Sequence, residues 1–338
     1  MKLHIPFCKQ MMSLAAGAVF TAGTAFSLIP IATHAQDAWP SKPVKVIVPS
    51  SPGGGTDAYA RIIAQALSDA TRQQFVIDNR PGASGGIGAQ AVAKSAPDGY
   101  TILLSANAAI AINPALYKNL PFDADKDFAP ITRGVMAPMV IAAFPGNSAG
   151  AGYKTLADLV GAAKREPNTI AYGSAGSGSP PYLGVRMLEE AAGVKFIHVP
   201  YKGVGPAYVD LLAGRIKFIF TDLATAQQHI AAGKVTALAV NQRTALLPGV
   251  QSIAEAGWPK VEMFTSFSLL APAGTPADIV QRLNALTASA MKQPAVAEKL
   301  TTQALVPVFD TPEQFTASLK QERAQWSAFV QRNNITPE

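Results

Sequence analysis

The sequence contains little that could cross-link the chain or hold a metal ion. One of its 338 residues is a cysteine, Cys8, and of its four histidines only His198 and His229 lie beyond His34. A chain of this length buries enough apolar surface to fold without disulfide bonds. Two histidines about thirty positions apart with no thiol nearby do not make a zinc or transition-metal site. We therefore expect no disulfide framework, no metal and no cofactor.

The chain also lacks a dense cationic run. Its 28 Lys and Arg residues are interspersed with 22 Asp and Glu residues, for a formal net charge of +6, of which Lys2 and Lys9 supply two. A mildly basic surface without aromatics interleaved in a basic run attracts small anions and does not grip nucleic acid. We expect no nucleic-acid partner.

The N-terminus has the order of a secretory signal peptide. Lys2 and Lys9 precede an apolar run over 11–31, and small residues end at Ala35. This pattern predicts export with cleavage after Ala35. The cysteine precedes the apolar core, so this is not a lipoprotein signal. A retained membrane anchor is the alternative, because the run is nearly long enough to span a bilayer.

Beyond this segment, short apolar runs alternate with helical patterns. The runs at 44–48, 75–77 and 101–104 are each followed by a loop containing Gly, Ser or Asn. Helical periodicity follows, for example over 57–67 and 87–94. The recurrence of strand, loop and helix predicts an α/β layer with parallel strands.

A second series of the same kind begins beyond Pro145. Its predicted strands are 169–172, 195–199, 218–220 and 236–240, and its predicted helices are 182–191, 206–213 and 224–231. Two such series in tandem imply two lobes, each a mostly parallel sheet flanked by helices.

The C-terminal part supplies a strand at 267–270 and helices at 277–292 and 312–331. Thr275 is the expected N-cap of the first of these helices, with Pro276 at its first position. The first lobe needs more helices than its own series provides, so we expect this part to return to it. The predicted organisation is a signal peptide at 1–35, one domain from 36–138 plus 264–338, and a second from 139–263.

A glycine-rich loop at 49–57 (PSSPGGGTD) joins the first predicted strand to its helix. Three glycines allow backbone conformations that turn amide N–H groups inward, and the helix adds its positive end. Such a loop can bind an anion. The alternative is a tight turn in which Thr56 or Asp57 serves only as the N-cap.

A second loop at 172–180 (YGSAGSGSP) repeats this chemistry in the other lobe. It alternates glycine with hydroxyl groups and enters a helix with Ser179 as expected N-cap and Pro180 in the first turn. Ligands of open α/β sheets lie beyond the carboxyl ends of the strands, where both loops fall. Two such loops indicate one acidic ligand held between the lobes.

Other loops at the same edge add candidates on geometric grounds. For Lys202 a solvated surface charge is the alternative, and for Asp222 a helix N-cap. As a ligand contact, Asp222 would suit a donor group on the ligand, or would hold water. The candidate ligand-binding residues are Ser50, Ser51, Gly53, Gly54, Thr56, Asp57, Ala106, Asn107, Ser174, Gly176, Ser177, Gly178, Ser179, Tyr182, Tyr201 and Asp222.

Catalytic patterns are weak. Residues 82–86 (GASGG) match the spacing of a hydrolase nucleophile elbow, but Arg80-Pro81 interrupts the approach to Ser84. Neither glycine loop ends in the lysine and serine of a phosphate-binding P-loop. A secreted serine hydrolase is therefore the weaker alternative, and we do not expect an enzyme.

With these residues in place, the chain resembles the extracytoplasmic solute receptors of the tripartite tricarboxylate transporter system, the Bug family. The motifs that carry the resemblance span the predicted mature chain in order: Trp39-Pro40, 46–57, 79–83 with Gly85 and Gly88, 97–100, 113–114 with 116–117, 200–203, 238–240 and 271–276.

The resemblance implies a periplasmic protein of the Venus flytrap type, type II-like, with two hinge crossings. It implies a small carboxylate ligand, bound at 49–57, partly through ordered waters, and at 174–179, and partners in one large and one small integral membrane subunit. We expect a monomer. A receptor that reports the carboxylate to a membrane kinase stays open, because both uses depend on the same ligand-bound shape.

The chain departs from the family pattern at two positions. Ser50 stands where relatives usually carry an aromatic residue, and Tyr182 where histidine is common. Loss of a ring enlarges the pocket, and Tyr182 offers an aromatic wall with a hydroxyl group. These differences favour a ligand larger than a four-carbon diacid, such as a benzene carboxylate.

Overall fold

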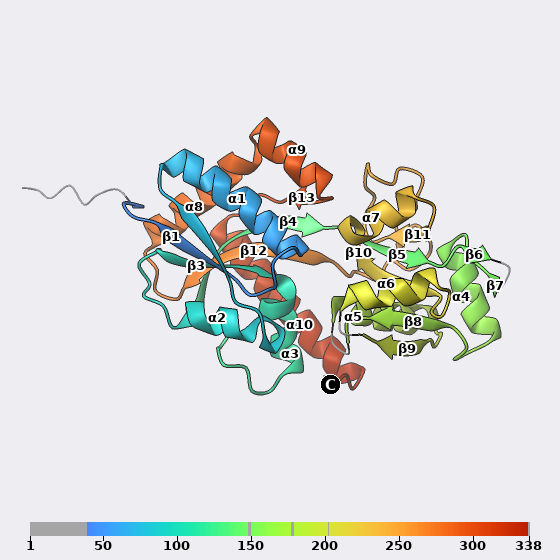
Figure 1. Ribbon diagram of the computed structural model, residues 1–338. Helices are drawn as coiled ribbons and strands as arrows, with labels where there is room; N and C mark the ends of the chain where they lie inside the picture. The colour runs from blue at the N-terminus through green and yellow to red at the C-terminus, as the bar shows by residue number, and fades with distance from the viewer. Residues whose placement is uncertain (1–38, 148–149, 177–178, 202, 337–338) are drawn as a thin grey trace, which may run out of the picture. The chain divides into compact units, whose positions relative to one another are not determined.

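The computed structural model describes residues 39–147, 150–176, 179–201 and 203–336, all within one compact unit (Figure 1). The predicted signal peptide, residues 1–35, lies outside the described residues. Within these described ranges, no helix is both long enough and apolar enough to cross a membrane.

The first sheet has six strands in the order β13-β4-β12-β3-β1-β2. β1 pairs in parallel with β2 and β3, whereas β12 is antiparallel to β3 and β4, and β13 is antiparallel to β4. The strands are β1 (Val44–Val48), β2 (Phe75–Asn79), β3 (Thr101–Ala106), β4 (Phe128–Ala137), β12 (Thr265–Pro272) and β13 (Val306–Pro307).

Helices cover both faces of this sheet because alternate strand residues point to opposite sides. Val46 and Leu104 pack with helices α1 (Gly55–Thr71), α8 (Ala277–Met291) and α9 (Pro294–Thr302). Ile47 and Leu103 belong to the core on the other face. The elements contributing to that core are α2 (Gly86–Ala93), the π-helix η2 (Ala108–Ile112), α3 (Asn113–Leu116) and α10 (Pro312–Arg332), and a short 3-10 helix, η1 (Ala83–Gly85), precedes α2.

The second sheet has five strands in the order β11-β5-β10-β8-β9. Its strands are β5 (Met139–Ala143), β8 (Ala171–Ser174), β9 (Ile197–Pro200), β10 (Phe218–Asp222) and β11 (Thr236–Val240). Phe218 and Phe220 pack with α4 (Leu156–Arg165) and α5 (Pro180–Ala192), and Ile219 packs with α6 (Val204–Leu212) and α7 (Leu223–Ala231). A small hairpin, β6 (Gly146–Asn147) with β7 (Gly150–Ala151), completes this part.

The chain passes between the sheets twice. Only Pro138 separates β4 of the first sheet from β5 of the second, and the return runs from β11 to β12. β13 and helices α8 and α10 then pack on β4, which confirms that the C-terminal part returns to the first sheet. Figure 1 shows α10, in red, beside α3, and α10 also contacts η2.

The predicted two-domain α/β fold, with each sheet flanked by helices, is confirmed, with two differences. The sheets are mixed and not mostly parallel, because β4, β5 and β12, which make the crossings, pair in antiparallel fashion. Thr275 is not a helix N-cap: Pro276 occupies that position, and the Thr275 hydroxyl donates to the Pro272 carbonyl at 2.8 Å. A proline at N-cap leaves the helix without a side-chain cap.

Strands β4 and β5 and helices α4 and α9 were not predicted. β5 is buried throughout, so it shows no polar and apolar alternation, and β4 contains Pro130 and Gly134, which read as loop residues. All the helices and strands that were predicted are present, with their ends moved by a few residues.

Candidate functional site

The first glycine loop ends in an uncapped helix. Gly53 has a φ of 88°, in the left-handed region that favours glycine, and Gly54 occupies the N-cap position of α1. No side chain caps the helix, so the amide groups of its first turn are available to an anion. Neither Thr56 nor Asp57 is the N-cap, and the anion-binding interpretation of the loop stays a prediction.

Asp57 holds this loop in shape. Its carboxylate accepts hydrogen bonds from the Gly53 amide at 3.0 Å, Arg61 Nε at 2.9 Å and Asn79 Nδ2 at 3.0 Å. Burial opposes the charge, but the hydrogen bonds from Arg61, Gly53 and Asn79 hold the pKa of Asp57 below its usual value. The side chain is only 4% exposed. Asp57 therefore stabilises the turn from inside, and its contact with a ligand stays a prediction.

A cavity of about 240 Å³ lies where this loop faces the end of β10. It is lined by Gly53, Gly54, Gly55, Ala58, Ala137, Asp222, Ala224, Thr225, Phe267, Gln303 and Leu305. The first turns of α1 and α7 both contribute to this lining. Two helix N-termini at one cavity favour a negatively charged occupant.

Asp222 is the N-cap residue of α7, but its side chain makes no capping hydrogen bond. Its Oδ1 is buried and has no hydrogen-bond partner among the described residues. Burial raises the pKa of this carboxyl group, and a hydrogen bond with Thr265 offsets the shift only in part. The helix-cap interpretation therefore accounts for the backbone of Asp222 but not for the buried Oδ1 of its carboxyl group.

The second glycine loop is held by its own hydroxyl groups. Ser179 is the N-cap of α5, as predicted, and its hydroxyl donates to the Gly176 carbonyl at 2.7 Å. Ser174 is 2% exposed, and its Oγ accepts a hydrogen bond from the Gly176 amide at 3.1 Å. Ser177 and Gly178 lie outside the described residues. The hydroxyls of Ser174 and Ser179 thus shape the loop, and ligand contact by this loop stays a prediction.

His198, on β9, was not among the predicted site residues. Its Nε2 lies 2.7 Å from Ser174 Oγ, and its ring lies between those of Tyr172 and Tyr182, with centroids 5.1 and 4.7 Å away. The parallel pairing of β8 and β9 brings these residues together. Sequence alone offered no signal for this contact, because it depends on the pairing of two strands, in which His198 lies opposite Tyr172 and Ser174 lies opposite Pro200.

The remaining predicted residues have separate environments. Asn107 is 1% exposed, and its side-chain amide donates to Glu322 Oε1 at 2.7 Å and to the Phe264 carbonyl at 3.3 Å. The Tyr201 hydroxyl donates to Asp210 at 2.7 Å, and burial together with this bond raises its pKa to about 12. Ala106 is half-buried at the end of β3. Ligand contact by these three residues stays a prediction.

Two serines of the first loop differ in exposure. Ser51 is exposed, whereas the Ser50 Oγ is buried without a hydrogen-bond partner among the described residues. Of the sixteen predicted site residues, the cavity brings together Gly53, Gly54 and Asp222. The cavity also has lining residues that were not predicted, because they come from segments far from either glycine loop: Thr225, Phe267, Gln303 and Leu305.

The hydrolase pattern does not have the backbone of a nucleophile elbow. β2 ends at Asn79, and the Ser84 backbone belongs to the 3-10 helix η1, beyond Pro81 and Gly82. An elbow requires a strand that leads directly into the serine.

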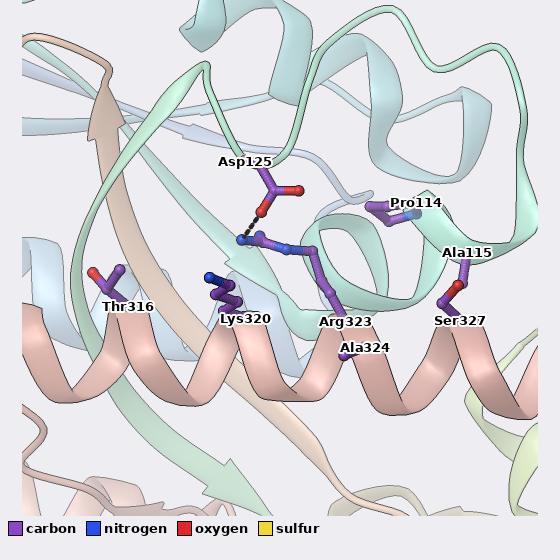
Figure 2. Close-up of a pocket in the computed structure, with 8 residues that line it drawn as sticks. All are labelled: Pro114, Ala115, Asp125, Thr316, Lys320, Arg323, Ala324 and Ser327. Atoms are coloured by element: carbon purple, nitrogen blue, oxygen red, sulfur yellow. Dashed lines mark hydrogen bonds and ion pairs between the residues drawn. The ribbon is translucent and has the colours of Figure 1, made fainter.

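A larger groove of about 660 Å³ runs along α10 beside α3 (Figure 2). Lys320 and Arg323 both line it, and Arg323 donates to Asp125 Oδ1 at 2.6 Å and to the Ala124 carbonyl at 3.1 Å. Arg323 therefore ties α10 to the loop before β4, and the groove contains none of the predicted site residues.

Comparison with known proteins places this geometry in a family. The model of the tripartite tricarboxylate transporter family receptor (TctC) matches residues 59–335. The chain is 35% identical to the UPF0065 protein in the tcbD-tcbE intergenic region of Pseudomonas sp. strain P51, over 97% of both chains. It is 34% identical to protein BugT of Bordetella pertussis, covering 87% of this chain and 90% of BugT.

Solved structures similar to this chain include periplasmic proteins with the same fold. A periplasmic transporter is 36% identical, with a TM-score of 0.78 over 88% of this chain and 99% of that one. R. palustris Rpa4515 with adipate is 32% identical, with a TM-score of 0.78 over 89% and 100%. MatC from Rhodopseudomonas palustris with bound malate is 29% identical, with a TM-score of 0.74 over 86% and 99%.

Proposed function

Because the chain belongs to the tripartite tricarboxylate transporter receptor family, whose members are periplasmic solute-binding receptors and not enzymes, we propose that it binds a small carboxylate in the cavity between α1 and α7. The bound form delivers this ligand to a transporter with one large and one small membrane subunit. The protein acts as a monomer, exported to the periplasm with its signal cleaved after Ala35.

The cavity itself carries the proposal. It joins the uncapped N-terminus of α1 to the first turn of α7, so backbone dipoles of two helices favour negative charge at one place. Phe267 and Leu305 supply apolar surface for the rest of the ligand. A volume of about 240 Å³ suits a small organic acid.

The similar proteins bind adipate and malate, and we propose a di- or tricarboxylate or an aromatic acid such as a benzene carboxylate for this chain. Ser50, which carries no ring, leaves room at the first loop. Tyr182 lies against His198 beside the second loop, outside the described lining of the cavity. We propose that closure of the two domains brings an aromatic ligand against its ring.

We propose two domains that close on the ligand, 36–138 plus 264–338 and 139–263. The boundaries fall at the two crossings between the sheets, near Pro138 and ahead of β12. We propose that these two crossings act as hinges. Addition of a carboxylate that binds should reduce the radius of gyration of the protein in solution scattering. An unchanged radius at saturating ligand would contradict closure.

A thermal-shift and calorimetric screen tests the ligand class. The panel is succinate, adipate, malate, citrate, benzoate and terephthalate. We expect stabilisation by at least one acid larger than succinate. Stabilisation by succinate alone would overturn the larger-ligand proposal, and binding of none would overturn the receptor function.

A pair of variants at Gly54 tests the site. Gly54 has an extended backbone, and a Cβ there meets only the Ser51 carbonyl, at 3.9 Å. Gly54→Asp and Gly54→Asn both supply a good N-cap, so both should fold. The added carboxylate should weaken binding of the best panel acid at least tenfold relative to Gly54→Asn, because it repels the ligand. Equal affinities would contradict binding at this loop.

A further inference from the structure

The cavity contains one ionisable side chain among its described lining residues, that of Asp222. No Lys, Arg or His contributes to this lining. A carboxylate ligand therefore meets an acid and no cation. Two carboxylates that share a site do not both ionise, because like charges at short distance disfavour the second charge.

The geometry of Asp222 agrees with a neutral acid. Its Oδ1 is buried and has no partner among the described residues, although Asp222 heads a helix whose amides could have bonded to it. A buried carboxyl oxygen without a donor is costly when charged. The same oxygen becomes a donor when it carries hydrogen, and it then needs an acceptor, which a ligand carboxylate supplies.

The polar and titratable groups near Asp222 are those of Thr265, Tyr208 and His229. Thr265 on β12 offers a hydroxyl, and Tyr208 on α6 lies in the field of the carboxyl group, since burial and the Asp222 charge both raise the pKa of Tyr208. The Tyr208 hydroxyl is itself buried without a partner in the described part of the chain, and the ring stacks on His229 at 4.6 Å. His229 is thus held against Tyr208.

We propose that Asp222 is the specificity-determining residue of the site and that it binds the ligand as a neutral acid, donating its hydrogen to one oxygen of the ligand carboxylate. Where Asp222 is ionised in the free protein, one proton enters from the solvent with each ligand, so that the Asp222 carboxyl group and the ligand carboxylate together carry a single negative charge. The other carboxylate oxygen accepts from the amides at the start of α1. This inference rests on the proposed function, and it explains how a cavity whose described lining has no cationic side chain holds an anion.

The arrangement also selects among ligands. An acid–carboxylate pair fits a group that accepts a hydrogen bond and carries at most one charge at the point of contact. A ligand that presents an ammonium group to Asp222 would instead require the ionised form. The site therefore takes carboxylates and excludes cationic amines at this position.

The test is isothermal titration calorimetry with adipate, or with the tightest acid of the panel, in buffers of different ionisation enthalpy from about pH 5 to about pH 9. Wild-type protein should take up as much as one proton per ligand. Its Kd should rise by up to tenfold per pH unit between the free and the bound pKa of Asp222. Asp222→Asn keeps a hydrogen-bond donor that does not ionise. The variant should therefore bind with a Kd that is independent of pH and without proton uptake.

Asp69→Asn is the matched control, because Asp69 is exposed on α1 and bonds only to Gln65 among the described residues. It should behave as wild type. Binding without proton uptake by the wild type, an unchanged pH dependence in Asp222→Asn, or loss of binding by folded Asp222→Asn would each overturn the inference while leaving the receptor function in place. Failure of every panel acid to bind would overturn the function as well.

Discussion

The side-chain amide of Asn107 donates a 2.7 Å hydrogen bond to the Glu322 carboxylate, which joins the end of β3 to the middle of α10 across 215 positions of sequence. The same amide reaches the Phe264 carbonyl, just ahead of β12. Asn107 thereby connects a strand end, a chain crossing and the C-terminal helix. This connection makes the first sheet dependent on the last helix of the chain.

Glu322→Gln should remove a pH dependence of stability. Burial raises the pKa of Glu322, which is 5% exposed, and the Asn107 bond only partly offsets this. A raised pKa in the folded state means that the stabilising contribution is complete below the unfolded pKa of about 4.3 and is lost as pH rises through the folded value. The variant, which cannot ionise, should gain stability relative to wild type as pH rises. Urea unfolding at several pH values measures this, and a constant difference would contradict it.

Asp57→Asn should destabilise the protein by about 2 kcal/mol at neutral pH, because it weakens charge-assisted hydrogen bonds from Arg61, Gly53 and Asn79. The pKa of Asp57 is lowered in the folded protein. Its contribution is therefore present above the unfolded value of about 3.9 and is lost as pH falls through the folded value.

The unfolding free energies of wild type and Asp57→Asn should accordingly converge in acid. Asp69→Asn, an exposed acid on the same helix, serves as the control and should change stability by less than about 0.5 kcal/mol. If Asp57→Asn leaves the free energy of unfolding unchanged, the loop does not depend on this carboxylate.

Gly53→Ala should cost about 1 kcal/mol, because the alanine must adopt a φ of 88°. Gly54→Ala is the matched control: its φ is −85°, and its Cβ would lie 3.9 Å from the nearest atom. Denaturant unfolding of both variants separates backbone strain from loss of flexibility. Equal costs for the two would show that the loop relaxes around Gly53.

Ser174→Ala and His198→Phe should be coupled. The 2.7 Å contact between Ser174 Oγ and His198 Nε2 is lost in either variant, so the second change adds little to the first. A double-mutant cycle on the free energy of unfolding should give a coupling energy of about 1 kcal/mol. Additive effects would mean that this contact does not hold the second glycine loop.

Much of the fold follows from local pattern. Strands such as Val44–Val48 and helices such as Gly55–Thr71 combine apolar periodicity with turn residues at their ends, and these signals depend only on neighbours in sequence. The same holds for Ser179 as the N-cap of α5. Buried strands such as Met139–Ala143 carry no such pattern, because both faces are covered and every position is apolar.

The candidate site likewise has features that the sequence predicts and features that depend on the folded structure. Sequence by itself determined that two glycine loops follow strands and open helices, and that Asp222 stands at a strand end. Tertiary structure decided which of these residues share a cavity. It also decided the hydrogen bonds of the others: Asp57 and Ser174 bond within their own loops, and the buried Asn107 bonds to Glu322. The reason is physical: conformational preference is local to a few residues, whereas burial, charge and hydrogen-bond partners depend on segments that meet only when the chain has folded.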